Sequence, residues 1–214
     1  MTQTHFYKTL AEIHEDVAPS HYDVGIKTNL FQKYWHWRRF KEVLSIIKPV
    51  QGSVLDLGCH SGTFTQQIIT EIGSTEIYGL DISAKAIDLA KKRIPDGKFV
   101  VGDAGDLPFD NNFFEAVFCL EMMEHVDNPG QVLREIKRVA KKDARIYILV
   151  PSDNNLFKIV WFLWTLYYPV WRHAHVQSFS KDLLEKMITQ TGFKILDVKA
   201  FNFGMLKLIV CQKP

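Results

Sequence analysis

VLDLGCHSGTF, residues 54–64, is the stretch that decides the fold expected for this chain. The apolar run over 53–57 predicts a short buried strand, which ends at Gly58 and leads into a helix beyond Gly62. Glycines at such positions let the backbone turn sharply and approach a ligand closely, where a Cβ would collide. By itself the turn has two readings, a ligand-binding loop and an ordinary tight connection between a strand and a helix.

Strand-like and helix-like segments alternate on the C-terminal side of this turn. The expected strands cover 53–57, 76–81, 98–101, 116–120 and 145–150, with Pro151 ending the last. This alternation is typical of a parallel sheet whose connections are helices. Two further strand-like runs, 193–198 and 205–211, follow each other closely and predict an antiparallel hairpin at the sheet edge.

The N-terminal part of the chain reads differently from this core. Apolar residues recur at helical spacing over 29–47, so we expect a helical cap over 1–50 and a Rossmann-like core over 51–214. The full length, 1–214, suits a single domain. The composition, 47% hydrophobic and 23% charged, is that of a globular protein.

Charge and cysteine usage narrow the expected partners and compartment. The net charge is +2, from 26 basic and 24 acidic residues, which is too weak a field to predict nucleic-acid binding. Cys59, Cys119 and Cys211 are odd in number and far apart, which fits neither a disulfide framework nor a zinc site. The first residues lack the basic and apolar regions of a signal peptide, so we expect a cytoplasmic protein.

Acidic residues stand at the ends of three successive expected strands. They are Asp56, Asp81 and Asp103. A carboxylate after the second strand of such a sheet can accept both hydroxyls of a ribose, and one after the third can accept from an adenine amino group. One acidic residue at a strand end is more often a helix cap. Three in succession favour a nucleoside site.

Four short motifs closely resemble those of class I S-adenosylmethionine-dependent methyltransferases, and the small-molecule type 11 group is the nearest. The motifs are DLGCHSG at 56–62, LDI at 80–82, GDA at 102–104 and LPFD at 107–110. The resemblance implies an α/β, Rossmann-like sheet of seven mostly parallel strands in the order 3-2-1-4-5-7-6. In that family strand 7 is antiparallel and helices cover both faces.

The resemblance also implies S-adenosylmethionine as the cofactor and a set of residues around it. The set is Asp56, Gly58, His60 and Gly62 in the turn, Asp81, Ile82, Asp103 and Ala104 at the next strand ends, Leu120 after the fourth strand, and Arg38. Arg38 stands where related O-methyltransferases have an arginine that pairs with the cofactor's carboxylate. A surface arginine on an amphipathic helix is the alternative reading.

His60 departs from the family pattern, which usually has glycine at this position. Histidine tolerates a positive φ better than β-branched residues do, but at some cost. The departure therefore predicts either weaker cofactor binding or a contact between His60 and the ligand. The departure also leaves open the alternative that the protein binds the cofactor but does not catalyse a reaction.

The run LEMMEHV, residues 120–126, carries two carboxylates and an imidazole in Glu-x-x-Glu-His spacing. It resembles the ubiquinone-pathway O-methyltransferases and the small-RNA 2′-O-methyltransferases, in which such a set holds a divalent metal. The resemblance implies Glu121, Glu124 and His125 as ligands of Mg²⁺ or another divalent metal, with His175 as a further ligand. In the alternative reading His125 or Glu124 acts as a catalytic base without a metal.

Residues 154–176 form an aromatic insert, whose apolar stretch 156–171 reads LFKIVWFLWTLYYPVW. It is too short and too interrupted to span a membrane. Three readings remain: a core helix or homodimer contact, a lid over a hydrophobic acceptor, and a helix lying in a membrane interface. The last two favour a lipid- or quinone-like acceptor and a peripheral membrane contact.

The expected reaction is transfer of a methyl group from a sulfonium to a small acceptor, with O-methylation favoured because of the Glu-x-x-Glu-His resemblance. The rivals are a silent protein that uses the aromatic insert as an interface and a nicotinamide-dependent oxidoreductase. The latter is disfavoured because the turn from Gly58 to Gly62 lacks the G-x-G-x-x-G spacing.

Overall fold

The protein is described by a computed structural model that covers residues 20–73, 76–167, 179 and 182–214. Within them, seven strands form one sheet in the order β3-β2-β1-β4-β5-β7-β6. The strands are β1 (Ser53–Leu57), β2 (Glu76–Asp81), β3 (Lys98–Val101), β4 (Phe114–Leu120), β5 (Ala140–Pro151), β6 (Lys194–Phe201) and β7 (Leu206–Gln212). β7 is antiparallel to both β5 and β6, and the other pairs are parallel. The expected order and the closing hairpin are confirmed.

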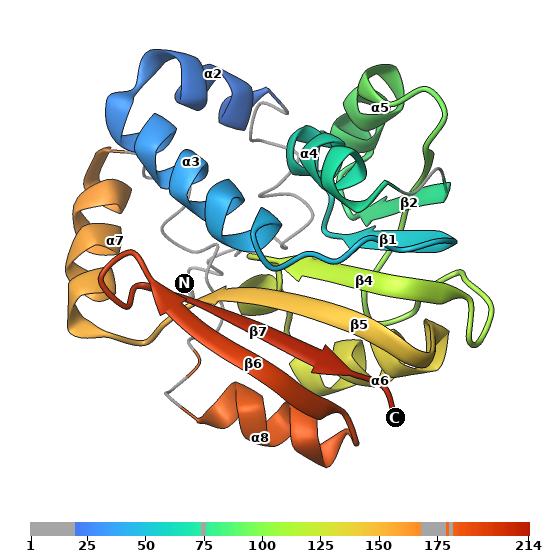
Figure 1. Cartoon of the computed structure of the whole chain (residues 1–214). Coiled ribbons are helices and arrows are strands. Elements are labelled where there is room, and N and C mark those ends of the chain that lie inside the picture. The colour runs from blue at the N-terminus through green and yellow to red at the C-terminus, as the bar shows by residue number, and fades with distance from the viewer. Residues whose placement is uncertain (1–19, 74–75, 168–178, 180–181) are drawn as a thin grey trace, which may run out of the picture.

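Helices on both sides turn the sheet into the middle layer of three (Figure 1). α3, α4 and α5 lie on one face, and α6 and α8 lie on the other. The described helices are α2 (His21–Thr28), α3 (Leu30–Leu44), α4 (Thr63–Ile72), α5 (Ala84–Arg93), the 3₁₀ turn η1 (Met123–His125), α6 (Pro129–Val139), α7 (Asn155–Tyr167) and α8 (Leu183–Gln190).

Polar side chains set the starts of several helices. The Ser83 hydroxyl accepts from the N–H of Ala86 at 3.3 Å, and the Asn128 side chain accepts from the N–H of Gln131 at 3.0 Å. Serine and asparagine are among the residues that favour the N-cap position, because their side chains accept a free backbone N–H of the first turn. Asn29 caps α3 in the same way, so the helix expected over 29–47 begins at Leu30, and it ends at Leu44.

The central strands are buried on both faces, and their side chains alternate between the two helical layers. In β1, Val54 packs with α3 and α4, whereas Leu55 packs with α6 and α8. β5 is longer than the expected 145–150, because its first residues, which carry few apolar side chains, still pair with β4 at Phe114–Ala140. Pro151 is the last residue of β5 and does not interrupt the strand.

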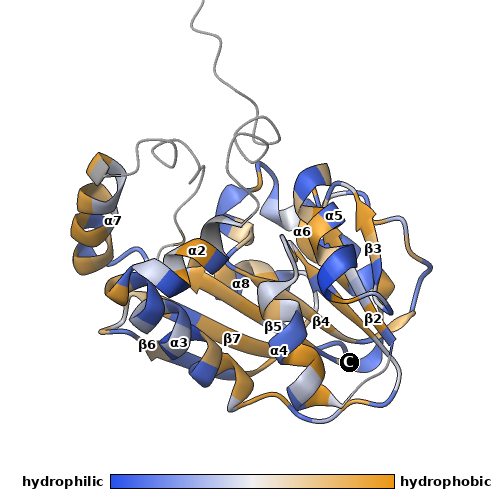
Figure 2. Cartoon of the chain, turned by 90° about the horizontal axis from the view of Figure 1, so that it is seen from above, coloured by the Kyte–Doolittle hydropathy of each residue, from blue (hydrophilic) through white to orange (hydrophobic). Residues whose placement is uncertain are grey.

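Part of the aromatic insert forms α7, which stands at the periphery of the molecule and is coloured mostly hydrophobic (Figure 2). Residues 168–176 of the insert, including the candidate ligand His175, lie outside the described residues. In the part of the chain that the structure describes, no helix has the length and apolarity needed to cross a membrane.

Candidate active site

The turn after β1 depends on backbone conformations that favour glycine. Gly58 has a φ of 79°, and a Cβ there would lie 2.7 Å from Cγ of Met122. Gly62 has a φ of 72° and caps the start of α4. His60, between them, also has a positive φ of 46°, a region that residues with a Cβ rarely occupy. The turn therefore excludes a side chain at Gly58 and carries strain at His60.

Asp81, at the end of β2, holds this turn in place. Its Oδ2 accepts the N–H of His60 at 2.8 Å, and its Oδ1 accepts the N–H of Ser83 at 2.9 Å. The carboxylate is only 7% exposed. Each carboxylate oxygen has more than one acceptor site, so Asp81 can still accept ligand hydroxyls while it fixes the turn.

Asp56 is a buried carboxylate inside β1. The Thr65 hydroxyl donates to its Oδ2 at 2.6 Å. Burial raises the pKa of Asp56 to about 6; the Thr65 hydrogen bond opposes that rise and the charge of Asp81 adds to it. A cationic ligand group beside Asp56 would lower this pKa again, because an opposite charge stabilises the carboxylate.

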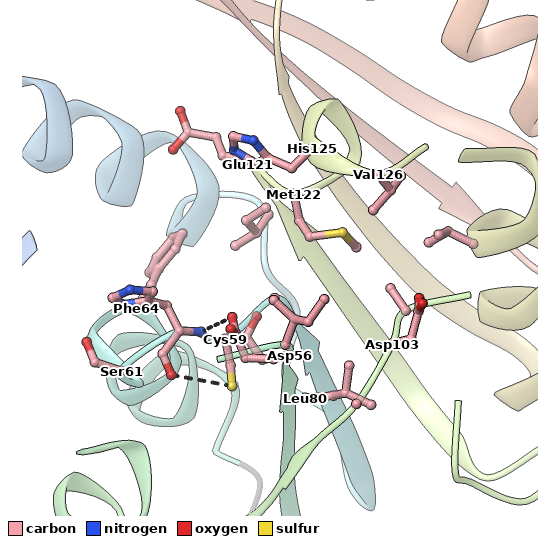
Figure 3. A pocket seen from close by; sticks show the side chains of 18 of the residues that line it. Asp56, Cys59, Ser61, Phe64, Leu80, Asp103, Glu121, Met122, His125 and Val126 are labelled. Atoms are coloured by element: carbon pink, nitrogen blue, oxygen red, sulfur yellow. Dashed lines mark hydrogen bonds between the residues drawn. The ribbon is translucent and has the colours of Figure 1, made fainter. Parts of the chain in front are cut away.

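A cavity of about 580 Å³ lies at the carboxyl ends of β1, β2 and β4, a size typical of small-molecule sites. Eight of the ten expected cofactor-binding residues line it: Asp56, Gly58, His60, Asp81, Ile82, Asp103, Ala104 and Leu120. Figure 3 shows Glu121 and His125 at one side of the cavity, with Asp56 and Asp103 at the other. Asp103 Oδ1 accepts the N–H of Gly105 at 2.7 Å. Gly62 supports the turn but does not line the cavity.

The arginine at the cavity is the neighbour of the expected one. Arg38 pairs with Glu42 at 2.8 Å and does not line the cavity, so the structure does not bring it to the other expected cofactor-binding residues. Arg39 lines the cavity, forms an ion pair with Glu121 and lies 2.8 Å from Nδ1 of His36. Helical phase carries the signal that was missed, because Gln32, His36, Arg39 and Val43 follow one another at three- or four-residue spacing on the inward face of α3.

The residues Glu121, Glu124 and His125 do not converge as a metal site. η1 is a single 3₁₀ turn, and Glu121 precedes it with a φ of 54°, so the expected α-helical alignment fails. Glu121 points to Arg39, whereas Glu124 is buried with no hydrogen-bond partner for Oε2 among the described residues. Within those residues no group of three His, Cys, Asp or Glu side chains is placed to hold a metal ion. The metal expectation is therefore not supported by the three ligands described.

Burial also changes the chemistry of Glu124. It raises the pKa of the carboxyl to about 8, and the nearby Arg39 charge offsets this only in part. At neutral pH such a carboxyl is mostly protonated, which makes it a poor proton acceptor. His125, which lines the main cavity, is the remaining candidate for a base.

A second cavity, of about 140 Å³, adjoins the first. Five aromatic side chains of α3 and α7 line one part of it, namely Phe31, Trp35, Phe157, Trp161 and Trp164, and polar side chains that include Glu121 and Glu124 line the rest. His36, Arg39, Glu121 and His125 line both cavities and so form the boundary between them. The sequence pointed to the aromatic insert, but not to the face of α3 that opposes it.

The N-terminal helices are fastened to the cofactor turn by a polar cluster that the sequence did not reveal. Asp23 of α2 forms an ion pair with Arg93 of α5 and accepts the Thr63 hydroxyl at 3.0 Å. Arg93 in turn donates to the carbonyl of Ser61 at 2.9 Å. The cluster joins α2, α4 and α5 at the rim of the main cavity.

Comparisons with known proteins agree with this geometry. Residues 55–148 match a family model described as a methyltransferase domain. The demethylmenaquinone methyltransferase of Thermotoga maritima is 34% identical over 168 residues, which cover 78% of this chain and 69% of that protein. The protein of the same name from Lactobacillus johnsonii is 29% identical, with coverages of 92% and 89%. A protein solved in complex with the Haloferax volcanii methyltransferase activator Trm112 has the same fold, with a TM-score of 0.74, 20% identity and coverages of 90% and 97%.

Proposed function

This chain belongs to the S-adenosylmethionine-dependent methyltransferases, and on that premise we propose that it methylates a quinol-like ring that carries an apolar tail. The observation that carries the proposal is the aromatic-lined cavity between α3 and α7, which adjoins the main cavity. The main cavity would hold the cofactor and the acceptor ring. The second cavity would hold the first part of the tail.

The residues of the main cavity suit the parts of S-adenosylmethionine. Asp56, whose raised pKa calls for a cationic neighbour, would lie near the methionine ammonium. Asp81 would accept the ribose hydroxyls, and Asp103 the adenine amino group. Arg39, in place of Arg38, lines the cavity and would face the cofactor's carboxylate or an acceptor oxygen beside its partner Glu121.

The acceptor assignment combines the second cavity with the names of the relatives. A cavity of about 150 Å³ lined by apolar side chains accepts one benzene-sized group, so 140 Å³ suits one aromatic ring or one isoprene unit. The relatives are named for demethylmenaquinone, whose methylation occurs on a ring carbon. We therefore place the reaction on carbon, and O-methylation, first favoured from the sequence, is the rival outcome.

The proposed methylation needs a base and an acceptor carbon that is aligned with the methyl group. When a quinol hydroxyl loses its proton, its electrons can move to the adjacent ring carbon, which forms a bond to the methyl carbon of the sulfonium. The carbon–sulfur bond would break with its electron pair staying on sulfur. The methylated carbon would then lose its proton, which restores the aromatic ring, and the ring oxygen would take a proton back, so that one proton is released overall. His125 would take the first proton, and Arg39 would stabilise the resulting oxyanion.

No step of this proposal uses a metal, because Glu121 is engaged by Arg39 and no group of three possible ligands gathers among the described residues. The silent alternative rested on the departure at His60. The structure accommodates that residue with a positive φ and a hydrogen bond from its N–H to Asp81, so the departure does not argue against catalysis.

The test is methyl transfer from methyl-labelled S-adenosylmethionine to reduced 1,4-naphthoquinones with and without a short prenyl chain. We expect label in a product that can be reoxidised to a quinone, with the prenylated acceptor preferred. A labelled product that cannot be reoxidised would assign the reaction to oxygen. A prenylated naphthoquinol already methylated at the free ring carbon is the matched control. Absence of transfer to every quinol, with S-adenosylhomocysteine still bound, would overturn the acceptor class.

A further inference from the structure

α7 is apolar on two faces, and one of them is turned away from the protein. Phe157, Trp161 and Trp164 face α3 and line the second cavity. On the opposite side, Phe162 and Leu163 are 61% and 58% exposed. A helix that is apolar all round normally has both sides covered, so the outer side of α7 marks an interaction surface.

The beginning of α3 extends this surface. The rings of Phe31 and Trp164 lie 6.4 Å apart, which places the first turn of α3 beside α7. Leu30, in that turn, is 84% exposed. We call the exposed apolar side chains of the two helices the α3–α7 face: Leu30, Phe31, Ile159, Phe162, Leu163 and Leu166. The second cavity lies between the two helices that carry this face.

The charge near the α3–α7 face is basic in excess. α7 contains Lys158, which pairs with Asp153 just before the helix at 2.8 Å, and no acidic residue of its own. Residues 24–37 contain Lys27 and Lys33, both exposed, and no acidic residue. A negatively charged surface would attract these lysines. A second copy of the chain, docked by the same face, would instead bring like charges together.

We propose that the α3–α7 face docks on a bilayer that contains anionic lipids, and that the second cavity receives the acceptor's tail from that bilayer. Apolar side chains with lysines beside them are the pattern of helices that lie in a membrane interface. Docking by this face would set the opening between α3 and α7 against the lipid. Only the part of this inference that concerns the acceptor's tail rests on the proposed function, because the chain can bind lipid without transferring a methyl group.

The test is flotation of the full chain with vesicles of phosphatidylcholine alone or mixed with phosphatidylglycerol, without acceptor or cofactor. The test variant is Phe162→Glu with Leu163→Glu. The control is Leu196→Glu with Val198→Glu, which places the same charges at exposed apolar positions on β6. We expect the wild-type chain and the control to bind the anionic vesicles, with weaker binding at high salt. The affinity of the α7 variant for these vesicles should be at least tenfold lower.

Folding of both variants is checked by thermal unfolding and by S-adenosylhomocysteine affinity, which lipid docking should not alter. Transfer to a prenylated acceptor held in vesicles should fall for the α7 variant, while transfer to a tail-free acceptor in solution should not. Unchanged vesicle binding by the α7 variant would overturn the proposal. So would a wild-type dimer that this variant converts to monomer, since the face would then cover a second copy. Failure of all methyl transfer with intact vesicle binding would count against the proposed function alone.

Discussion

The two sides of the cleft are built in different ways. On the proposed cofactor side, the candidate contact residues lie at strand ends and in a turn that hydrogen bonds to Asp81 hold in place. On the acceptor side, the walls come from α3 and α7, which meet through aromatic side chains such as Phe31 and Trp164. The first side is set by local sequence, whereas the second is a contact between distant segments. The comparison suggests that substitutions on the two sides change different measurable quantities.

The largest effect is expected where the two sides meet. His125→Ala removes the proposed base, and general base catalysis contributes about 10²–10⁴-fold, so kcat should fall by that order. Cofactor affinity should change little. Steady-state kinetics together with calorimetric titration of S-adenosylhomocysteine separate the two quantities. An equal loss in both would show that His125 is a structural part of the cofactor side.

Asp81→Ala tests the cofactor side. The carboxylate accepts two backbone N–H groups and is placed to accept the ribose hydroxyls. Hydrogen bonds to a charged group contribute roughly 1.5–3 kcal/mol each, so affinity for S-adenosylhomocysteine should drop by about 100-fold or more. Asp96→Ala, at an exposed position, is the control by the same titration. An affinity within a few-fold of the wild type would contradict the assignment of Asp81.

Trp161→Ala tests the acceptor side. Truncating an aromatic side chain in a buried contact costs roughly 1–2 kcal/mol, so KM for a soluble prenylated acceptor should rise by about tenfold. KM for a tail-free acceptor should stay the same. Phe162→Ala, on the outer face of the same helix, is the matched control and should leave both values unchanged in the absence of membranes. Equal changes for both acceptors would place the tail elsewhere.

His60→Gly should have the smallest effect. Glycine adopts the φ of 46° without strain, whereas this conformation costs a residue with a Cβ about 1–2 kcal/mol of folding free energy. The greater conformational freedom of glycine in the unfolded chain partly offsets this gain in stability. Cofactor affinity, measured by titration, should therefore be retained or improved. A large loss of affinity would show that the imidazole contacts the ligand.

Much of the fold followed from the sequence, because its signals are local. Apolar runs predicted the strands, and the four motifs between residues 56 and 110 implied the strand order through their family resemblance. The early start of β5 was missed, since the pairing of Ala140 with Phe114 leaves no apolar pattern.

The candidate site also has features that depend on local sequence and features that depend on tertiary contacts. The sequence by itself determined the left-handed turn and the row of aspartates at the strand ends, because both depend on a few consecutive residues and on parallel strands ending at one edge. Only the tertiary structure decided that Arg39 and not Arg38 faces the cavity, and that Glu121 turns to Arg39 while Glu124 is buried. Those outcomes depend on the rotation at which α3 packs against the sheet and on one 3₁₀ turn. Helical spacing within α3 indicates an inward face that includes Arg39, but the segment which that face meets is set by contacts between residues distant in sequence.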